Sequence, residues 1–340
     1  MNEYNLSTNR NKSHSLLSLA HEYPVQRSVT HSAFGPNELT TDVYALGRIS
    51  AKWPNKSIEQ EFRCSYDVIN KYDKDIKDPN MNSYRDGRAP FWVNSEQTLN
   101  CCTPSTNSIK NEGKAWKEEE ERNIINTVLS SRYFRYLARE LDWKLQDLYH
   151  NDMYRLIPSE YNMQLLINAL AKSKPSEKDE ALTVNSLVVG QLVPTLGHEN
   201  TIKISRFHQV DAQEIANNAS YLDCFDSQND LINVIHAYLV LAKNNGLADE
   251  ERALNYILCY GYSFYQKMYK QRSQTSSYQA IRLVNIDARV DYVGERTLVC
   301  VIFNFQDSKT NATEAWSSTV DVTETFPFMV AQFEPYINIL

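Results

Sequence analysis

Residues 227–270 constrain the fold most, because they carry the pattern of two helices joined by a short turn. Apolar side chains recur at helical spacing along one face of the first helix, at Leu231, Val234, Ile235, Tyr238, Leu239 and Ala242. Ser227 or Asp230 is expected to cap the start of this helix, and Gly246 to end it in the left-handed conformation. The pattern predicts a helix with one buried face.

The second helix of the pair is expected to run from Asp249 to residue 270. Asp249 is the predicted N-cap, followed by two glutamates that suit the positive end of the helix dipole. Gly261 falls inside the apolar stripe, where a glycine costs about 1 kcal/mol relative to alanine. We interpret it as a point of close approach by another element. The two helices together predict a hairpin that packs against a further layer.

That layer is predicted to be a C-terminal antiparallel sheet. Apolar and charged residues alternate over 286–292, 298–303 is apolar throughout, and 320–326 alternates again. The short polar connections favour a meander over crossover units. The predicted fold class is α+β, with the helical hairpin packed against this sheet.

Upstream of the hairpin the sequence predicts further helices and one strand. A long helix is expected over 116–150, shorter helices over 57–71 and 158–171, and a strand over 182–193 ending near Gly190 and Pro194. Residues 197–226 show no clear period. The expected organisation is therefore a mobile polar tail at 1–38, followed by one domain at 39–340 with a polar insertion at 72–115.

Composition indicates which partners the protein does not bind and in which compartment it is expected. The chain has 42 acidic and 35 basic residues and a formal net charge of −7, which argues against a nucleic-acid binder. We find no secretory signal, and no apolar run near the roughly 18 residues that a membrane span needs. Six scattered cysteines are typical of reduced thiols. We expect a cytoplasmic protein that binds neither nucleic acid nor membrane.

Common catalytic and binding motifs are not found in the sequence. There is no G-x-S-x-G, no glycine-rich phosphate loop and no standard zinc spacing, so no catalytic residue, cofactor or metal is predicted. If the protein is an enzyme, the first candidates are His150, His198, His208 and Asp211. His198 and His208, with Asp211 and Glu199 nearby, also form the best metal candidate, although a solvated loop is favoured. The pair His150/Asp152 is interpreted as a helix-end cap, and a catalytic dyad is the less favoured alternative.

Five stretches in order resemble one protein family. They are the segment YALG at 44–47, LVVGQLVP at 187–194, NNGLADEERALNY at 244–256, an aromatic at Phe264, and STVDVTETFP at 318–327. Together they resemble the C-terminal domain shared by PatA and PatG, the maturation proteases of cyanobactin biosynthesis. The resemblance spans residues 43–327, and we expect the domain to stand here without the protease domain.

The resemblance implies no catalytic residue. The matched positions are interpreted as structural: Tyr44, Gly47, Gly190, Gln191, Pro194, Arg252, Asn255 and Asp321. The two strand glycines suit turns or bulges. We further hypothesise that Arg252 and Asp321 form a partly buried ion pair between helix and sheet.

Three functions follow as hypotheses. The favoured one is a non-catalytic recognition or scaffold protein that binds a ribosomally made precursor peptide, or a maturation protease or cyclase, for example by adding a strand to an exposed edge of the C-terminal sheet. The alternatives are an enzyme of unrecognised type acting on a peptide, and a structural or regulatory subunit such as a homodimer.

Overall fold

The computed structural model describes most of the chain from residue 42 onward. The described ranges are 42–76, 114–172, 185–193, 200–220, 227–273, 281–307 and 310–337. The predicted tail at 1–38 and most of the predicted insertion at 72–115 lie outside them. Residues 72–76 and 114–115 of that insertion belong instead to helices α2 (Lys56–Ile76) and α4 (Lys114–Ser130).

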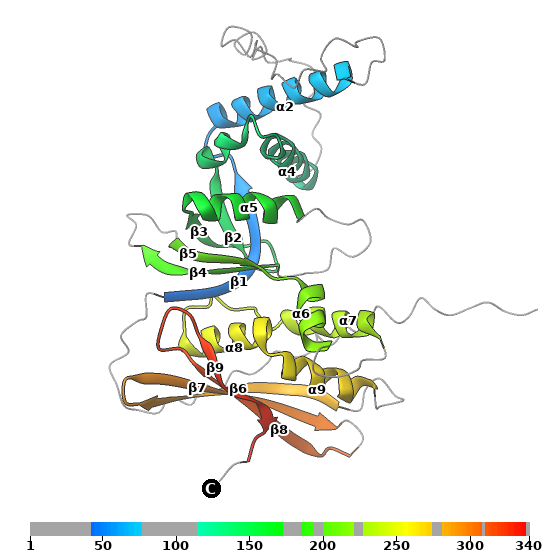
Figure 1. Ribbon diagram of the computed structural model, residues 1–340, viewed down its shortest axis with the longest axis vertical. Coiled ribbons are helices and arrows are strands. Elements are labelled where there is room, and N and C mark those ends of the chain that lie inside the picture. Colours follow the sequence, from blue (N-terminus) through cyan, green and yellow to red (C-terminus); the bar gives the residue numbers. More distant parts are fainter. Residues whose placement is uncertain are drawn as a thin grey trace, which may run out of the picture.

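The first half of the chain folds around a closed five-stranded barrel in the order β1-β2-β3-β5-β4 (Figure 1). Its strands are β1 (Asp42–Lys52), β2 (Asp142–Gln146), β3 (Asp152–Ile157), β4 (Ser186–Val193) and β5 (Thr201–Gln209). The long β1 pairs with β4 through its first half and with β2 through its second. Neighbouring strands are antiparallel except β3 and β5, which run parallel.

A group of helices packs against the barrel on the side away from the C-terminal sheet (Figure 1). These are α2, α4 and α5 (Glu160–Lys172), with the short 3-10 helix η1 (Arg135–Glu140) beside them. Their apolar side chains join the barrel interior in one core, in which Phe62, Val128 and Leu166 are fully buried with Leu145 of β2. This core belongs to the N-terminal half of the molecule.

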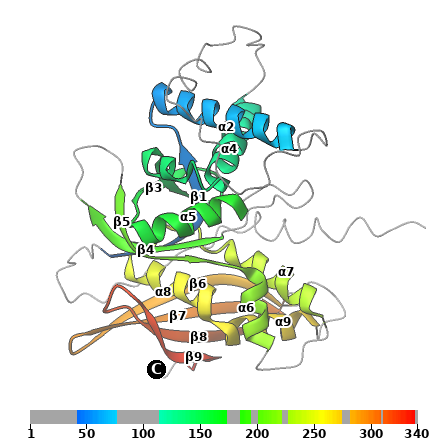
Figure 2. The same cartoon turned by 45° about the horizontal axis from the view of Figure 1, so that its top comes forward.

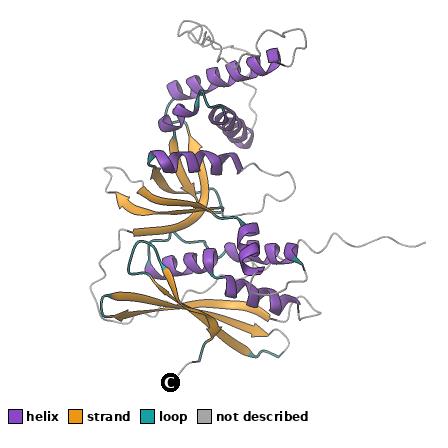
Figure 3. Cartoon of the chain, viewed as in Figure 1, coloured by secondary structure: helices purple, strands orange, loops and turns teal. Residues whose placement is uncertain are grey.

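A layer of four helices lies between the barrel and a second sheet (Figures 1 and 3). The helices are α6 (Ala212–Ser220), α7 (Gln228–Leu239), α8 (Asp249–Tyr260) and α9 (Tyr262–Ser273). Helix α8 contacts β1 on the barrel side and β6, β7 and β8 on the sheet side. Because the helices cover the outside of β1, residues Val43–Leu46 are buried on both faces of that strand.

The second sheet is an antiparallel meander in the order β6-β7-β8-β9, seen more openly in the turned view of Figure 2. Its strands are β6 (Ile281–Val293), β7 (Arg296–Asp307), β8 (Thr313–Asp321) and β9 (Phe328–Pro335). Alternate residues of β7 from Val299 to Phe305 face the helices and are buried with them in a second core. The predicted α+β class and the C-terminal antiparallel sheet are therefore confirmed.

The predicted hairpin is present, with changed helix ends. The Ser227 hydroxyl caps α7 by accepting from the Asp230 N–H, and Gly246 adopts a φ of +66°, although α7 ends earlier, at Leu239. Asp249 is the first helical residue of α8 rather than its cap. Gly261 interrupts the helix, and a Cβ there would lie 2.5 Å from the Ile257 carbonyl oxygen of the preceding turn. The close approach by another element that we predicted at Gly261 is therefore wrong.

Three further predictions need correction. The helix expected over 116–150 ends at Ser130, and the later part of that range forms η1 and β2. The break expected around 150–157 is strand β3. Residues 197–226, which had no assignment, contain β5 and α6.

Candidate functional site

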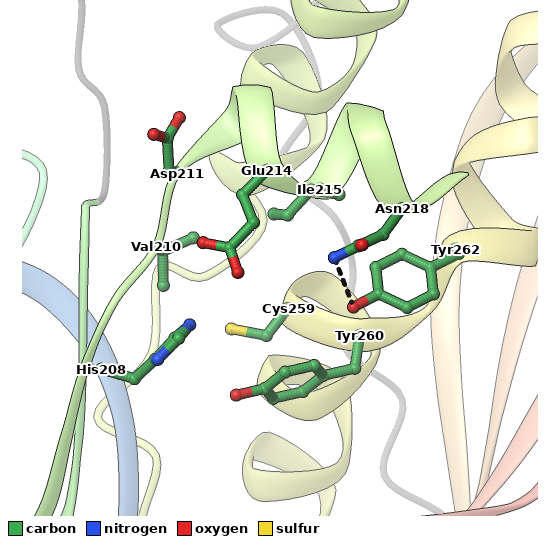
Figure 4. A pocket seen from close by; sticks show the side chains of 9 residues that line it. All are labelled: His208, Val210, Asp211, Glu214, Ile215, Asn218, Cys259, Tyr260 and Tyr262. Atoms are coloured by element: carbon green, nitrogen blue, oxygen red, sulfur yellow. Dashed lines mark hydrogen bonds between the residues drawn. The ribbon is translucent and has the colours of Figure 1, made fainter. Parts of the chain in front are cut away.

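A small cavity brings together two of the candidate catalytic residues. His208 at the end of β5 and Asp211 at the start of α6 line it with Glu214 and Asn218 of α6, and with Cys259, Tyr260 and Tyr262 from the other side (Figure 4). The His208 and Tyr260 rings lie 6.3 Å apart between centroids. The Asn218 amide donates to the Tyr262 hydroxyl at 3.2 Å. The fold thus juxtaposes an imidazole, a carboxylate and a thiol.

The size and electrostatics of this cavity limit its chemistry. Its volume is about 20 Å³, enough for roughly one water molecule. Burial raises the pKa of the Cys259 thiol well above its ordinary value, and it raises the pKa of Tyr260 to about 12. A thiol held in its protonated form is a poor nucleophile. The Asp211 carboxylate accepts from the Gln213 N–H at 2.8 Å, as a helix cap does.

The remaining candidate residues are placed elsewhere in the fold or lie outside the described ranges. His150 sits in the turn between β2 and β3 with a φ of +65°, so our interpretation as a helix-end cap is wrong. Asp152 contacts Lys144 at 3.0 Å and accepts from Gln146 at 2.7 Å. His198 and Glu199 lie outside the described ranges. Within those ranges, no three or more His, Cys, Asp and Glu side chains are grouped so that they could hold a metal ion.

A larger groove opens at one end of the barrel. It is formed where η1 ends, β2 and β5 begin, and β3 runs into α5, and its volume is about 500 Å³. Its apolar lining includes the buried Leu141, Trp143 and Leu156 and the exposed Ile157. The Trp143 indole is fixed by its hydrogen bond to the Ala138 carbonyl at 2.8 Å.

Two ion pairs form the polar part of this groove. Arg139 of η1 contacts Glu160 of α5 at 2.7 Å, with both side chains more than half exposed. Arg155 of β3 contacts Asp142 of β2 at 2.7 Å. An apolar cleft of this size with a few convergent polar groups has the composition of a ligand site. The groove is therefore the stronger binding candidate of the two hollows.

Four of the eight matched positions lie at two joints of the fold. At the joint between barrel and helices, the buried Asn255 amide donates to the Tyr44 carbonyl at 2.8 Å and exchanges hydrogen bonds with Asn244. The Tyr44 N–H donates to the Gly246 carbonyl at 2.8 Å. A Cβ on Gly246 would lie 2.2 Å from the Tyr44 carbonyl oxygen, so only glycine fits this contact.

At the joint between helices and sheet, our predicted ion pair of Arg252 with Asp321 is wrong. The buried Arg252 guanidinium contacts Asp249 at 3.1 Å, donates to the Val322 carbonyl at 3.0 Å, and also donates to the Glu324 carbonyl. Asp321 pairs instead with Arg296 at 2.6 Å. The helix is thus tied to the sheet through backbone carbonyls, because Arg252 reaches past the strand to the loop that follows it.

Three of the remaining matched positions belong to the barrel. Gly190 lies at a bulge of β4 against β5, as expected, and a Cβ there would lie 2.2 Å from the Lys203 carbonyl oxygen. Gly47 lies within β1, close to the Gln146 carbonyl, rather than at a turn. The Gln191 amide donates to the Asp42 carboxylate at 3.1 Å. Pro194 lies outside the described residues.

Sequence reasoning missed the groove because it missed the strands that form it. Asp142, Trp143 and Arg155 were inside a predicted helix or a predicted break. A weak signal existed in β3, where Arg155 separates the buried Tyr154 and Leu156, but the strand is only six residues long and its other neighbours, Met153 and Ile157, are apolar. The contribution of Cys259 and Tyr262 to the small cavity carried no signal in the sequence, since it depends on how α8 and α9 pack.

The architecture is that of an α+β protein in which a helical layer joins a small closed barrel to an open sheet. Family models and a solved structure match this chain over both parts. The family model described as PatG Domain matches residues 42–269, and the model described as PatG C-terminal matches residues 225–336. Because the first model covers more than half of the chain, the chain belongs to the PatG domain family. The two models overlap over residues 225–269, which contain α7, α8 and most of α9.

A solved structure titled "PatG Domain of Unknown Function" is similar in fold. It is 13% identical, the match covers 87% of this chain and 99% of that chain, and the TM-score is 0.51. At this identity the likeness shows the fold alone. A search of curated proteins gave no significant match. Among the residues that the structure describes, we find no helix with the length and apolar character needed to span a membrane.

Proposed function

We propose that this protein is a recognition module that binds a ribosomally made precursor peptide in the groove at the end of the barrel. The groove carries the proposal, because its volume of about 500 Å³ falls within the range of ligand clefts and its lining joins buried apolar side chains to two arginines. Membership of the PatG domain family supports a place in peptide natural-product biosynthesis.

The exposed Arg139–Glu160 pair gives the groove a simple mode of binding. Exposed ion pairs contribute only about 0–1 kcal/mol, so Arg139 can exchange Glu160 for a carboxylate of the peptide at little cost. Hydrogen bonds between ionised groups are stronger and more directional than neutral ones. Apolar peptide side chains then cover Ile157 and Leu141. The proposed ligand is a short peptide segment with an acidic or C-terminal carboxylate beside apolar residues.

Binding is tested with the full chain and the labelled precursor peptide encoded nearest its gene, followed by fluorescence anisotropy. Arg139→Gln is expected to weaken binding about ten-fold or more, since a hydrogen bond to a charged group contributes about 1.5–3 kcal/mol. Glu160→Gln removes the competing carboxylate and is expected to leave binding equal or tighter. Opposite effects of Arg139→Gln and Glu160→Gln on peptide affinity indicate a binding role for Arg139. If the ion pair were only structural, both variants would bind the peptide more weakly.

Arg63→Gln is the matched control, because Arg63 makes similar exposed ion pairs on α2, outside the groove. It is expected to leave the peptide affinity unchanged. Equal affinity of the Arg139→Gln and natural proteins would remove the groove from the proposal.

An enzyme acting on the peptide is the alternative, favoured by the convergence of His208 and Cys259 on one cavity. The small volume of that cavity and the protonated thiol weigh against it. The same experiment decides between the two, because the intact mass of the peptide is recorded before and after incubation. An unchanged mass with measurable binding supports recognition, and a changed mass overturns it in favour of catalysis.

A further inference from the structure

The 3-10 helix η1 carries a row of side chains that begins at the groove. Its backbone hydrogen bonds join residues three apart, and the same spacing continues before it, where the Phe134 N–H donates to the Ser131 carbonyl at 3.2 Å. Side chains three residues apart lie in line along a 3-10 helix. Tyr133, Tyr136 and Arg139 therefore form one row, which we call the η1 row.

Every member of the η1 row is open to solvent. Tyr133 is 48% exposed and Tyr136 is 58% exposed. The Arg139 side chain, which also lines the groove, is 62% exposed. Leu137 and Ala138 are buried in the barrel core and hold η1 in place. Tyrosine and arginine are among the side chains that most often carry binding energy in interfaces, so this row has the composition of a binding surface.

Each end of the η1 row carries an arginine. At the end away from the groove, the Arg132 guanidinium lies 4.8 Å from the centre of the Tyr133 ring and donates to its hydroxyl at 2.7 Å. Among the residues that the structure describes, Arg132 contacts no carboxylate, whereas Arg139 contacts Glu160. Stacking on the ring positions the Arg132 guanidinium, so it loses little freedom when it binds a carboxylate of a ligand.

The distance between the two arginines sets the spacing of the charges in a ligand. A 3-10 helix rises about 2.0 Å per residue, so the η1 row is roughly 12 Å long from Tyr133 to Arg139. An extended peptide rises about 3.3 Å per residue, so four residues span roughly 13 Å. Two carboxylates four residues apart on an extended peptide therefore match the two arginines, with the intervening residues over the tyrosine rings.

The middle of the η1 row does not favour a further carboxylate. The Tyr136 hydroxyl donates to the Glu61 carboxylate of α2 at 3.5 Å, which places a negative charge beside the ring. Arg135, next to Tyr136 in the chain, donates instead to the Leu129 carbonyl at 3.3 Å and to the Gln164 side-chain oxygen at 3.1 Å. Because like charges repel across an interface, the ligand residues over the middle of the row are expected to be uncharged.

We infer that the η1 row extends the proposed peptide site, and that its ligand is an extended peptide with two carboxylates four residues apart, one on Arg139 and one on Arg132. Uncharged residues between the carboxylates lie over the rings of Tyr133 and Tyr136. The peptide continues past Arg139 into the groove. The inference rests on the proposed function and adds to it the charge pattern that the peptide must carry.

The test uses the full chain and labelled synthetic peptides, with fluorescence anisotropy as the readout. Each peptide has two glutamates, either two or four residues apart, with alanine between them and leucine after the second. The four-residue spacing is expected to bind more tightly. Arg132→Gln is expected to weaken binding of that peptide about three- to five-fold, the range of an exposed ion pair, and to leave the peptide with the shorter spacing unchanged.

Reversal of charge gives the decisive result. Arg132→Glu is expected to weaken binding of the peptide with the four-residue spacing further than Arg132→Gln does, because like charges then meet. Lysine in place of the glutamate farther from the leucines is expected to restore binding to the Arg132→Glu chain. That rescue also shows that the variant is folded. A lysine peptide that binds the Arg132→Glu chain no better than the glutamate peptide does would overturn the inference.

The contribution of the rings is tested at Tyr136. Tyr136→Ala is expected to weaken binding about three-fold or more, whereas Tyr136→Phe keeps the ring and is expected to bind as the natural protein does. A lower melting temperature of Tyr136→Ala with unchanged peptide affinity would assign the ring to a contact within the chain and overturn the inference.

Lys243→Gln is the matched control, because Lys243 and Tyr149 repeat the arrangement of Arg132 and Tyr133. The Lys243 Nζ lies 5.1 Å from the centre of the Tyr149 ring and donates to its hydroxyl at 2.7 Å. Tyr149 follows the end of β2, whereas the groove lies where β2 begins. The control is expected to leave the affinity for both peptides unchanged.

The two arginines separate failure of this inference from failure of the proposed function. If Arg139→Gln weakens binding and Arg132→Gln does not, the groove remains a peptide site and the inference about the η1 row is overturned. If neither variant weakens binding, the proposed function fails and the inference fails with it.

Discussion

The barrel and the C-terminal sheet differ in whether their outermost strands are paired on both sides. Every barrel strand has two hydrogen-bonded neighbours, whereas β6 and β9 have one each among the described strands. A closed barrel offers partners only its ends and its loops, and its groove lies at such an end. An open sheet offers backbone groups along a whole strand. The two halves therefore differ in where hydrogen-bonding backbone groups lie at the margin of a sheet: at the ends of the barrel, and along the outer strands of the open sheet.

The largest expected effects come from emptying either core. Phe303→Ala in the sheet core is expected to lower the free energy of unfolding by about 3–5 kcal/mol, and Leu145→Ala in the barrel core by about 2–5 kcal/mol. Because α8 contacts both sheets, each variant is expected to shift one shared transition in urea. Two separate transitions, with only one of them shifted, would show that the halves unfold independently.

The joint between helices and sheet comes next. Arg252→Ala removes the guanidinium that holds Asp249 and two carbonyls, and is expected to cost about 3 kcal/mol, the low end for breaking a buried pair, because Asp249 is partly exposed. Thermal unfolding measures the loss, and hydrogen exchange should rise first in the loop 322–327. A melting temperature equal to that of the natural protein would contradict this role.

The joint between barrel and helices is expected to have a smaller effect. Asn255→Ala leaves the buried Tyr44 carbonyl without its side-chain donor, at a cost of about 1–3 kcal/mol. Faster hydrogen exchange is expected in β1 and in residues 244–248, with the C-terminal sheet unchanged. Equal acceleration in β6–β9 would show that the joint does not separate the two halves.

The smallest effect concerns acid stability, where one carboxylate of each half can be compared. Burial alone would raise the pKa of Asp321, but hydrogen bonds from Thr323 and Arg296 hold it below the usual value. Burial would also raise the pKa of Asp152, but hydrogen bonds from Gln146 and Lys144 hold it below the usual value. A depressed carboxyl pKa stabilises the fold above the unfolded pKa of about 3.9, and this stability is lost as pH falls through the folded value.

Both Asp321→Asn and Asp152→Asn are therefore expected to flatten the fall in unfolding free energy below about pH 4. The effect should be larger for Asp321, which is 3% exposed, because the side chain of Asp152 is 32% exposed and salt screens its pairs. Urea titrations from about pH 2.5 to about pH 7 at two salt concentrations provide the measurement. A larger effect at Asp152 would reverse this ranking of the two halves.

The sequence predicted the C-terminal half better than the barrel for a physical reason. The apolar stripe of α7 and the alternation in β6 are long enough to define a period, and they face one covering layer. In the barrel, β2 is five residues long, and Leu137, Leu141 and Leu145 happen to continue a helical spacing across the 3-10 turn. Ile202 and Ile204 of β5 alternate with polar residues and carried a detectable strand signal.

Side-chain partners were harder to predict than elements. The matched positions Arg252 and Asp321 were correctly placed near the same joint, but the arginine binds carbonyls of the loop after β8, which no spacing reveals. The groove depends on where a short strand, a 3-10 turn and a helix start converge. Such convergence is set by the tertiary fold, so the residues that carry the proposed function had no local pattern.

The position of β1 has a consequence for synthesis on the ribosome. Tyr44 is made 211 residues before Asn255, whose side chain bonds it. At translation rates of roughly 5–20 residues per second, this interval lasts roughly 10–40 s. Until α8 emerges, the outward Tyr44 and Leu46 lack the helix that covers them in the finished fold. A nascent chain that stalls before residue 249 keeps this apolar strand uncovered, and we expect a chaperone to bind β1 in such a chain.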